Sequence, residues 1–495
     1  MTAGETQVTQ EADRRRWLAL VVLCVGMLMI VLDVTVVNVA LPSIQNDLGF
    51  SQSSLAWVVN AYLISFGGLL LLAGRLGDLI GRRRVFMIGL AAFTVASLLC
   101  GIAQSQEVLV AARFAQGVGG AMTSAVILGM IVTMFPEPKE QAKAIGVYGF
   151  VASAGGSIGL LAGGILTEGI NWHWIFFINL PIAIGTAVAA ARLIDPDKGI
   201  GIGRGADVLG AVLVTGALML GVYTIVKASD YGWGSLDTLG LGAVSLALLA
   251  AFIARQARAT NPLMPLRLFR SRNVSGANLV QVVVVAGMFG MFFMGTLYLQ
   301  RVLGFDPLEI GFAFLPSTIV MGIFSAGVSA RVVTRFGARA TLIPALALVF
   351  VGLVLFARAP VGGSYVTDVL PAVIFVGIGA GLAFPSLMAL AMSGATRADA
   401  GLASGVVNTT AQVGGALGLA VLATLSSTRT DDLLAAGEST TSALTSGYHL
   451  AFIVGAGLVL VGIGIAVAVL RPESVAAEEA ARQQPTFDPA YSEGS

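Results

Sequence analysis

The stretch WLALVVLCVGMLMIVLDVTVVNVAL, residues 17–41, is one long apolar run that contains a single carboxylate, Asp33. Roughly 20 apolar residues suffice for a helix to cross a bilayer. Three arginines, residues 14–16, precede the run. Basic residues before an apolar stretch also mark signal peptides, but this run is too long for a signal core and further runs follow it. We therefore expect an uncleaved first membrane helix.

The composition of the whole chain points the same way. Of its 495 residues, 56% are apolar and 11% are charged, whereas soluble domains carry roughly 25% charged residues. Such a surface must face lipid, and the 62 glycines favour packed helices over a barrel. Two cysteines and two histidines exclude a disulfide framework or a histidine-rich metal site. We expect no metal, no cofactor and no nucleic-acid partner.

Apolar runs of spanning length recur along the chain and predict fourteen transmembrane helices. The expected spans are 17–41, 55–75, 84–104, 108–134, 144–166, 172–193, 207–227, 236–256, 274–302, 308–330, 339–358, 368–393, 401–425 and 448–470. An even number places both termini on one side of the membrane. The longest loop on the other side is expected at residues 427–447.

The basic residues fix which side that is. With the N-terminus in the cytoplasm, the inner segments hold 23 of the 28 Lys and Arg residues. This bias is typical of cytoplasmic loops. We expect a multi-pass protein of the cell membrane with both termini cytoplasmic. The polar, acidic residues 471–495 are predicted to form a disordered cytoplasmic tail.

Asp33 is the first candidate functional residue, because it lies slightly past the middle of its span. An ionised carboxylate at the centre of a membrane helix costs about 3 kcal/mol. We therefore interpret Asp33 as a site that exchanges a proton and faces an aqueous cavity. The alternative is a carboxyl group held in a hydrogen bond between helices.

Arg113, in the span 108–134, is the second embedded charge. Its predicted depth is comparable to that of Asp33, so the two could pair if their helices are neighbours. The alternative is an arginine that snorkels to the outer interface.

Two glycine patterns carry further information. The loop GRLGDLIGRRR, residues 74–84, predicts a tight inner turn at Gly74 and Gly81, and Asp78 could pair with an arginine or cap the next helix. A weaker copy, ARVVTRFGAR, occupies residues 330–339, as expected for two related halves. In the span 144–166, a packing or gating face is predicted from Gly155, Gly159, Gly163 and the adjacent Gly164.

Polar and aromatic side chains inside other spans are candidates to line a substrate cavity, since such mixed surfaces suit amphipathic ligands. Hydrogen bonds between helices would explain each of them equally well. These candidates are Asn38, Asn278, Gln281, Met288, Phe292, Asn408 and Gln412. The strings GxxxxGK[ST] and HExxH are absent, which argues against P-loop ATP hydrolysis and against this class of zinc hydrolase.

The chain resembles the major facilitator superfamily, and within it the fourteen-helix drug:proton antiporters. The resemblance covers roughly residues 15–470. Its motifs are LDVTVVNVALP (32–42), GRLGDLIGRRR (74–84), RFAQGVGGA (113–121), WIFFINLP (174–181) and YLQRVLGFDPLEIGFAFLP (298–316). Two positions depart from the antiporter pattern: Leu160 follows Gly159 where the family usually has proline, and His173 stands where arginine is frequent.

The resemblance implies two six-helix bundles, residues 17–193 and 261–470, with an inserted helix pair in residues 194–260 and a cytoplasmic tail at 1–16. It implies alternating access, in which Asp33 and Arg113 carry proton coupling. The resemblance also implies a cytoplasmic latch between the bundles. The latch residues would be Gly74, Asp78, Gly81, Arg82 and Arg83.

The expected function is proton-coupled export of small amphipathic molecules such as drugs and antibiotics, by a monomer that is not an enzyme. A dedicated exporter of one endogenous metabolite, lipid or peptide is the main alternative. A non-transporting membrane sensor or an intramembrane enzyme is a remote one, and the absence of a plausible nucleophile–histidine pair argues against the enzyme.

Overall fold

The computed structural model describes residues 3–197, 199, 201, 207–260, 262–264, 266–393 and 400–471. The predicted tail at 471–495 therefore lies outside the described residues from 472 onward. The helices of the first half are α1 (Ala3–Leu48), α2 (Gln52–Ile80), α3 (Arg82–Gly101), α4 (Gln106–Met134), α5 (Pro138–Gly169), α6 (Trp174–Phe177) and α7 (Asn179–Leu193).

The remaining helices follow after a connecting segment. They are α8 (Val208–Tyr231), α9 (Leu236–Arg258), α10 (Arg272–Arg301), α11 (Pro307–Ile323), α12 (Ser329–Phe336), α13 (Ala338–Phe356), α14 (Leu370–Met392), α15 (Ala400–Ala435) and α16 (Thr440–Ala468). A π-helical turn, Phe324–Val328, joins α11 to α12 without a break in the helix.

Short polar residues determine where many of these helices begin. A serine hydroxyl accepts a hydrogen bond from the first-turn backbone in α2, α4, α9, α10 and α16, which satisfies a donor that the helix itself leaves free. Before α11, Asp306 and Glu309 bond to each other's backbone in a capping box.

Twelve helices in the described part of the chain are long and apolar enough to cross a membrane. Two further apolar helices, Ile158–Gly169 within α5 and Pro307–Ile323, are shorter than the other twelve. The protein is thus an all-helical, multi-pass membrane protein. The predicted total of fourteen spans is not confirmed by this count.

Two expected boundaries are wrong. The presumed tail at 1–16 is helical from Ala3, because α1 extends well beyond the apolar run. The presumed loop at 427–447 is reduced to the segment between Ala435 and Thr440, since α15 and α16 continue into it and pack on each other. There the Thr430 hydroxyl of α15 donates to the Ala443 carbonyl of α16 (3.4 Å). The expected span 172–193 corresponds to one apolar span, Trp174–Leu193, in which Ile178 between α6 and α7 keeps a helical backbone.

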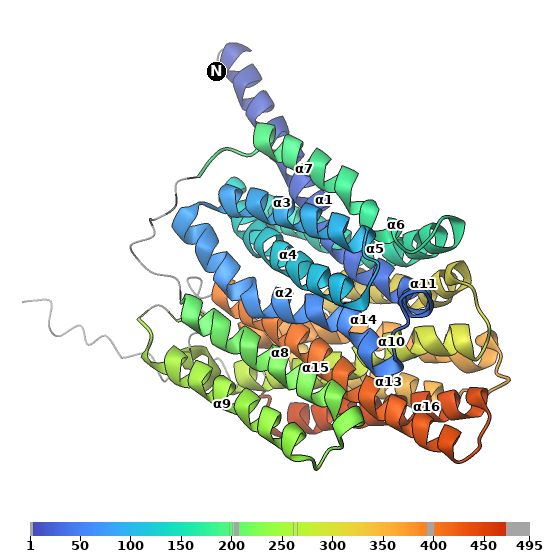
Figure 1. The fold of residues 1–495 in the computed structure, drawn as a ribbon. Coiled ribbons are helices and arrows are strands. Elements are labelled where there is room, and N and C mark those ends of the chain that lie inside the picture. Colours follow the sequence, from blue (N-terminus) through green and yellow to red (C-terminus); the bar gives the residue numbers. More distant parts are fainter. Residues whose placement is uncertain are drawn as a thin grey trace, which may run out of the picture.

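The helices gather into two groups, which correspond to the two halves of the chain (Figure 1). Helices α1 to α7 form the N-terminal bundle, and α10 to α16 form the C-terminal bundle. The two bundles meet where α2 packs on α15 and where α5 packs on α11. Close contact at the second place needs glycine: a Cβ on Gly311 of α11 would lie 2.7 Å from the Leu160 carbonyl of α5.

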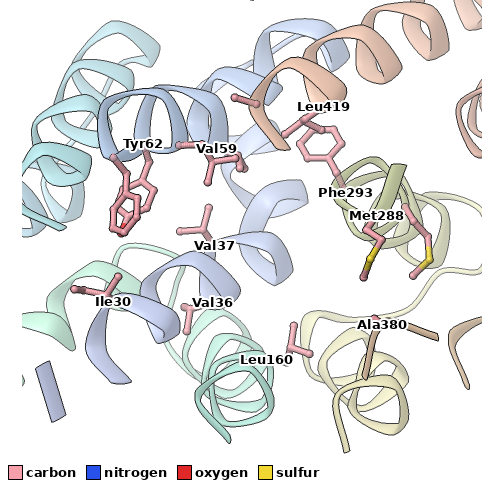
Figure 2. Close-up of a cluster of buried hydrophobic side chains, with 14 of the residues drawn as sticks. Ile30, Val36, Val37, Val59, Tyr62, Leu160, Met288, Phe293, Ala380 and Leu419 are labelled. Atoms are coloured by element: carbon pink, nitrogen blue, oxygen red, sulfur yellow. The ribbon is translucent and has the colours of Figure 1, made fainter. Parts of the chain in front are cut away.

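Apolar side chains from both bundles converge on the seam between them (Figure 2). Val36 and Val37 of α1 and Val59 of α2 lie on the side of the N-terminal bundle, and Met288 and Phe293 of α10 lie on the side of the C-terminal bundle. All five side chains are at most 5% exposed. Buried apolar side chains of both bundles therefore lie near the seam.

The predicted inserted pair corresponds to α8 and α9, shown in green at the edge of the molecule in Figure 1. Helix α8 contacts both bundles: Thr215 lies against Gly68 of α2, and the Thr424 hydroxyl of α15 donates to the Ile225 carbonyl (3.3 Å). Helix α9 packs mainly on α8. At their common end, the Asp207 carboxylate accepts hydrogen bonds from Arg255 (2.9 Å) and Gln256 (2.7 Å).

Candidate functional site: a buried carboxylate in the N-terminal bundle

The two embedded charges meet inside the N-terminal bundle. Arg113 Nη1 of α4 lies 2.5 Å from Asp33 Oδ2 of α1. The Asp33 side chain is 0% exposed and the Arg113 side chain 1%. Removing either partner would leave an uncompensated charge in a medium of low dielectric constant, which is strongly destabilising. Arg113 thus does not snorkel to an interface.

Two carboxamides complete the surroundings of the carboxylate. Asp33 Oδ1 accepts hydrogen bonds from Gln116 Nε2 of α4 (2.6 Å) and from Asn179 Nδ2 of α7 (2.9 Å). Gln116 Nε2 also donates to Ser97 Oγ of α3 (2.8 Å). Side chains from α4 and α7 therefore donate three hydrogen bonds to one carboxylate of α1.

Arg113 is held independently of Asp33. Its Nε donates to the Val58 carbonyl of α2 (2.9 Å), and its Nη1 also donates to Gln116 Oε1 (2.6 Å). The guanidinium lies over the Tyr62 ring, 4.5 Å from the centroid, and 5.8 Å from that of Phe176. Cation–π contacts are stronger when they are desolvated. The arginine is thus fixed in place even if the carboxylate changes its charge.

The sequence analysis did not assign roles to Gln116 and Asn179. Both occur in motifs that it quoted, RFAQGVGGA and WIFFINLP. Gln116 could have been found, because it lies three residues after Arg113 and so shares its helical face. Asn179 could not, because nothing in the sequence shows that α7 lies beside α1. The aqueous cavity expected at Asp33 is also absent in this conformation, in which the carboxylate is fully covered by protein.

The loop between α2 and α3 is a single-residue turn at Gly81, whose φ of 103° favours glycine. The Asp78 carboxylate pairs with Arg82 at 3.1 Å. Arg82 also donates to the Gly129 carbonyl and the Thr133 hydroxyl of α4, both at 2.9 Å. These bonds tie the end of α2 to α3 and α4.

Among the residues that the structure describes, the predicted latch side chains Asp78, Arg82 and Arg83 bond within the N-terminal bundle. Arg83 donates to the Ala191 carbonyl of α7 (2.6 Å), so its guanidinium, like that of Arg82, is held within the N-terminal bundle. Gly74 lies 4.0 Å, measured from a built Cβ, from Ala125 of α4. Asp78 does not cap α3 either. The Asp197 carboxylate accepts from the backbone N–H of Arg82 (2.6 Å) and of Arg83 (3.0 Å) instead.

The weak repeat of this loop has the same geometry in the second half. Gly337 has a φ of 87° and joins α12 directly to α13, as Gly81 joins α2 to α3. Arg339 donates to the Val467 carbonyl at the end of α16 (2.8 Å), as Arg83 does at the end of α7. Thr334, at the position of Asp78, bonds only to its own helix.

The glycines of α5 form a packing face against α1. A Cβ on Gly159 would collide with the Thr35 hydroxyl, and one on Gly163 would lie 2.9 Å from the Val36 carbonyl. Gly155 contacts Val31 in the same way, at 3.0 Å. Gly164 faces α11, where its built Cβ would lie 2.7 Å from Leu308 Cα. The α5 face therefore joins the carboxylate-bearing helix to the seam between the bundles.

The cavity candidates divide into two groups. Asn38 and Asn278 bond to carbonyls of their own helices, and Asn278 also accepts from Thr410 of α15 (2.9 Å), which is the kind of bond between helices that the alternative predicts. The others lie nearer the α2–α15 and α10–α11 contacts. Gln412 Cβ approaches Gly67, Phe292 packs on Phe314 (5.4 Å), Met288 and Gln281 are buried, and Asn408 is exposed.

These features define a class of protein: a helical membrane carrier with two related bundles and a buried ion pair in one of them. The family model of the Major Facilitator Superfamily matches residues 23–419, and the chain belongs to this family. It is therefore a membrane transporter of small molecules and not an enzyme, and the predicted resemblance to the superfamily is confirmed.

The chain is similar along nearly its whole length to proteins named for antibiotic resistance or export. It is 38% identical to the puromycin resistance protein of Streptomyces alboniger over 481 residues, covering 96% of this chain and 95% of that protein. It is 36% identical to the cephamycin export protein of Amycolatopsis lactamdurans over 94% of both chains.

Solved structures show the same fold at low sequence identity. A bacterial homologue of the human lysosomal transporter Spinster, in an inward-facing conformation, superposes with a TM-score of 0.65 at 14% identity, covering 94% of this chain and 98% of that one. The nucleoside transporter NupG gives 0.64 at 13% identity, with 92% and 100% coverage.

Proposed function

We propose that this protein exports amphipathic antibiotics or other drug-like molecules across the cytoplasmic membrane, in exchange for protons. The family supplies the transporter class, and the full-length relatives named for puromycin resistance and cephamycin export supply the substrate class. The hydrophobic seam between the bundles suits substrates of this kind, since apolar lining with few polar groups is typical of such sites.

The proposal of proton coupling rests on one observation: a buried carboxylate is held by an arginine from another helix. Protonation of Asp33 removes its attraction to Arg113. Because Arg113 stays bound to Val58 and Gln116, it is α1 that becomes free to move. The same helix carries Val36 and Val37 into the seam, so a change of charge at Asp33 can alter the packing between the bundles.

The proton gradient is strong enough for this purpose. A membrane potential of 100 mV supplies about 2.3 kcal/mol per charge, and one pH unit supplies about 1.4 kcal/mol. One proton could then sustain a substrate gradient of several hundredfold, at about 1.4 kcal/mol for each factor of ten.

The proposed topology has fourteen spans with both termini in the cytoplasm. Helix α5 extends over Pro138–Gly169, and α11 continues through its π-helical turn and α12 to Phe336, so each is long enough to cross although its most apolar part is short. The basic turns at Gly81 and Gly337 then face the cytoplasm, as the positive-inside rule requires. In the opposite conformation, Asp78 and the adjacent arginines would meet the C-terminal bundle there. The transporter acts as a monomer.

A specific observation supports the second candidate function, which is the dedicated export of one endogenous metabolite. Several relatives are named for a single antibiotic, among them tetracenomycin C and actinorhodin. Expression in a host that lacks its own drug pumps distinguishes the two. Raised resistance to puromycin, ethidium and other unrelated cations would support the multidrug function. Resistance confined to one compound would support the dedicated exporter, and unchanged accumulation of every compound would contradict export.

A further inference from the structure

The segment that follows α7 is fastened to the turn between α2 and α3. This connector runs from Ile194 to Asp207, the residue that caps α8. Its Asp197 carboxylate receives the two α3 backbone bonds described above, at 2.6 and 3.0 Å. Four residues later the Gly201 N–H donates to the Leu79 carbonyl of α2 (3.1 Å). The connector therefore bonds to both sides of the turn.

The two backbones also fit closely together. A Cβ on Gly81 would lie 2.8 Å from the Asp197 carbonyl oxygen, and a Cβ on Gly199 would collide with the Leu79 carbonyl. Side chains at these two positions would push the segments apart. The contact is thus built by the main chain of the connector and does not rest on one exposed side chain alone.

Electrostatics explains why an acid is needed here. Helix α3 begins with three arginines, at positions 82–84, although the N-terminus of a helix already carries a partial positive charge. Its N-cap, Gly81, has no side chain to accept a hydrogen bond. Asp78 is engaged by the Arg82 guanidinium. Asp197 supplies the missing acceptor and a compensating negative charge.

The other end of the connector leads into α8, the helix that touches both bundles. Helix α8 lies against α2 at Gly68, and its backbone accepts a hydrogen bond from Thr424 of α15. If the bundles rock against each other, α8 must stay with one of them and slide on the other. The described part of the connector, as far as Gly201, is bound to the N-terminal bundle a few residues before the cap of α8.

We infer that Asp197 is a positioning residue for transport, which fixes the α2–α3 turn and makes the inserted pair move with the N-terminal bundle. This inference rests on the proposed alternating-access function. The substrate does not contact Asp197, so its loss should slow the conformational change and leave substrate binding unchanged.

The test compares Asp197→Ala and Asp197→Asn with Asp195→Asn. Asp195 is equally exposed on the same connector but pairs with Arg15 (2.8 Å), so it controls for charge. In inverted membrane vesicles loaded with a proton gradient, Asp197→Ala should lower the maximal rate of ethidium uptake about tenfold with an unchanged KM. Asp197→Asn, which keeps one acceptor oxygen, should lie between it and the wild type. A raised KM at an unchanged rate, or wild-type behaviour of Asp197→Ala, would overturn the inference.

A distance measurement separates this inference from the proposed function. Spin labels at Leu209 of α8, paired with Val95 of α3 or Val351 of α13, report which bundle α8 follows, and all three positions are exposed. Between pH 5 and pH 8 the α8–α3 distance should stay constant in the wild type while the α8–α13 distance changes. Asp197→Ala should broaden the distribution of the α8–α3 distance. A constant α8–α13 distance with a variable α8–α3 distance would overturn the inference even if ethidium is not a substrate.

A second variant covers the case in which Asp197→Ala does not fold. Gly199→Ala should reproduce the slow rate, because its methyl group would strike the Leu79 carbonyl. Gly185→Ala in α7, where a built Cβ meets no atom within 4 Å, is the control. Equal rates for these two variants would overturn the inference.

Discussion

At the scale of single residues, three side chains donate hydrogen bonds to one buried carboxylate. Arg113 supplies the opposite charge, and Gln116 and Asn179 supply hydrogen bonds to the other oxygen. The proposed proton site is therefore the point at which α4 and α7 are joined to α1.

Asn179→Leu tests the role of the carboxamides. It removes one donor to Asp33, so the pH profile of proton-coupled transport should differ from that of the wild type. A hydrogen bond to a charged group contributes about 1.5–3 kcal/mol. The measurement is ethidium transport against pH in proteoliposomes. Asn38→Leu is the matched control, because the Asn38 amide bonds only to its own helix at Val34. The same pH profile for both variants would contradict a role for Asn179.

At the scale of helices, glycine decides where elements can approach. Gly159 and Gly156 lie three residues apart in α5, but only the first faces α1: a Cβ on Gly156 meets no atom within 4 Å. Gly159→Ala should therefore destabilise the protein by about 1–3 kcal/mol, the usual cost of overpacking. Gly156→Ala should be neutral. Thermal unfolding of both in detergent checks this, and equal midpoints would show that the α1–α5 contact can adapt.

The joint between α8 and α9 is predicted to depend on pH. Burial disfavours the charge of Asp207, but hydrogen bonds from Arg255, the Gly210 N–H and Gln256 outweigh it, so its pKa lies below the usual 3.8. Its contribution to stability is then complete above about pH 4 and is lost as the pH falls through the lowered pKa. The stability difference between wild type and Asp207→Asn should be constant from pH 5 to pH 8 and shrink below pH 4. A difference that already falls between pH 7 and pH 5 would contradict this assignment.

The sequence predicted the elements better than their contacts. Apolar runs located the helices, because lipid demands them, and the loop motifs located both single-glycine turns. The sequence could not show that Asn179 of α7 bonds to Asp33 or that Asp197 caps α3, since both contacts join residues more than 100 positions apart. The two boundary errors at 1–16 and 427–447 arose because polar helices do not differ from loops in hydropathy.

At the scale of the whole molecule, the orientation in the membrane is the next prediction. Both natural cysteines are buried, so single engineered cysteines can report sidedness with little background. Arg429→Cys, near the end of α15, should react with a membrane-impermeant maleimide on intact cells. Arg335→Cys, in the second basic turn, should react only after the cells are permeabilised. Both positions are exposed in the structure. Labelling of Arg335→Cys on intact cells would invert the proposed topology.

The two-bundle architecture makes one charge able to influence the whole molecule. Asp33 lies on α1, which packs on α5 through the glycine face, and α5 in turn closes against α11 of the other bundle. A proton at Asp33 can thus change the contact between bundles without touching the substrate. This is the physical content of the proposed antiport.

The most direct test of that claim is substrate-induced proton movement in proteoliposomes, with wild type beside Asp33→Asn. Asp237→Asn, at an exposed carboxylate at the start of α9, is the control. Asparagine keeps the shape of Asp33 without its charge, and gel filtration verifies folding. We predict proton flux that appears only when substrate is added, is retained in Asp237→Asn and is lost in Asp33→Asn. Substrate movement that ignores both the pH gradient and Asp33 would contradict the account and leave a facilitator in which the buried pair is purely structural.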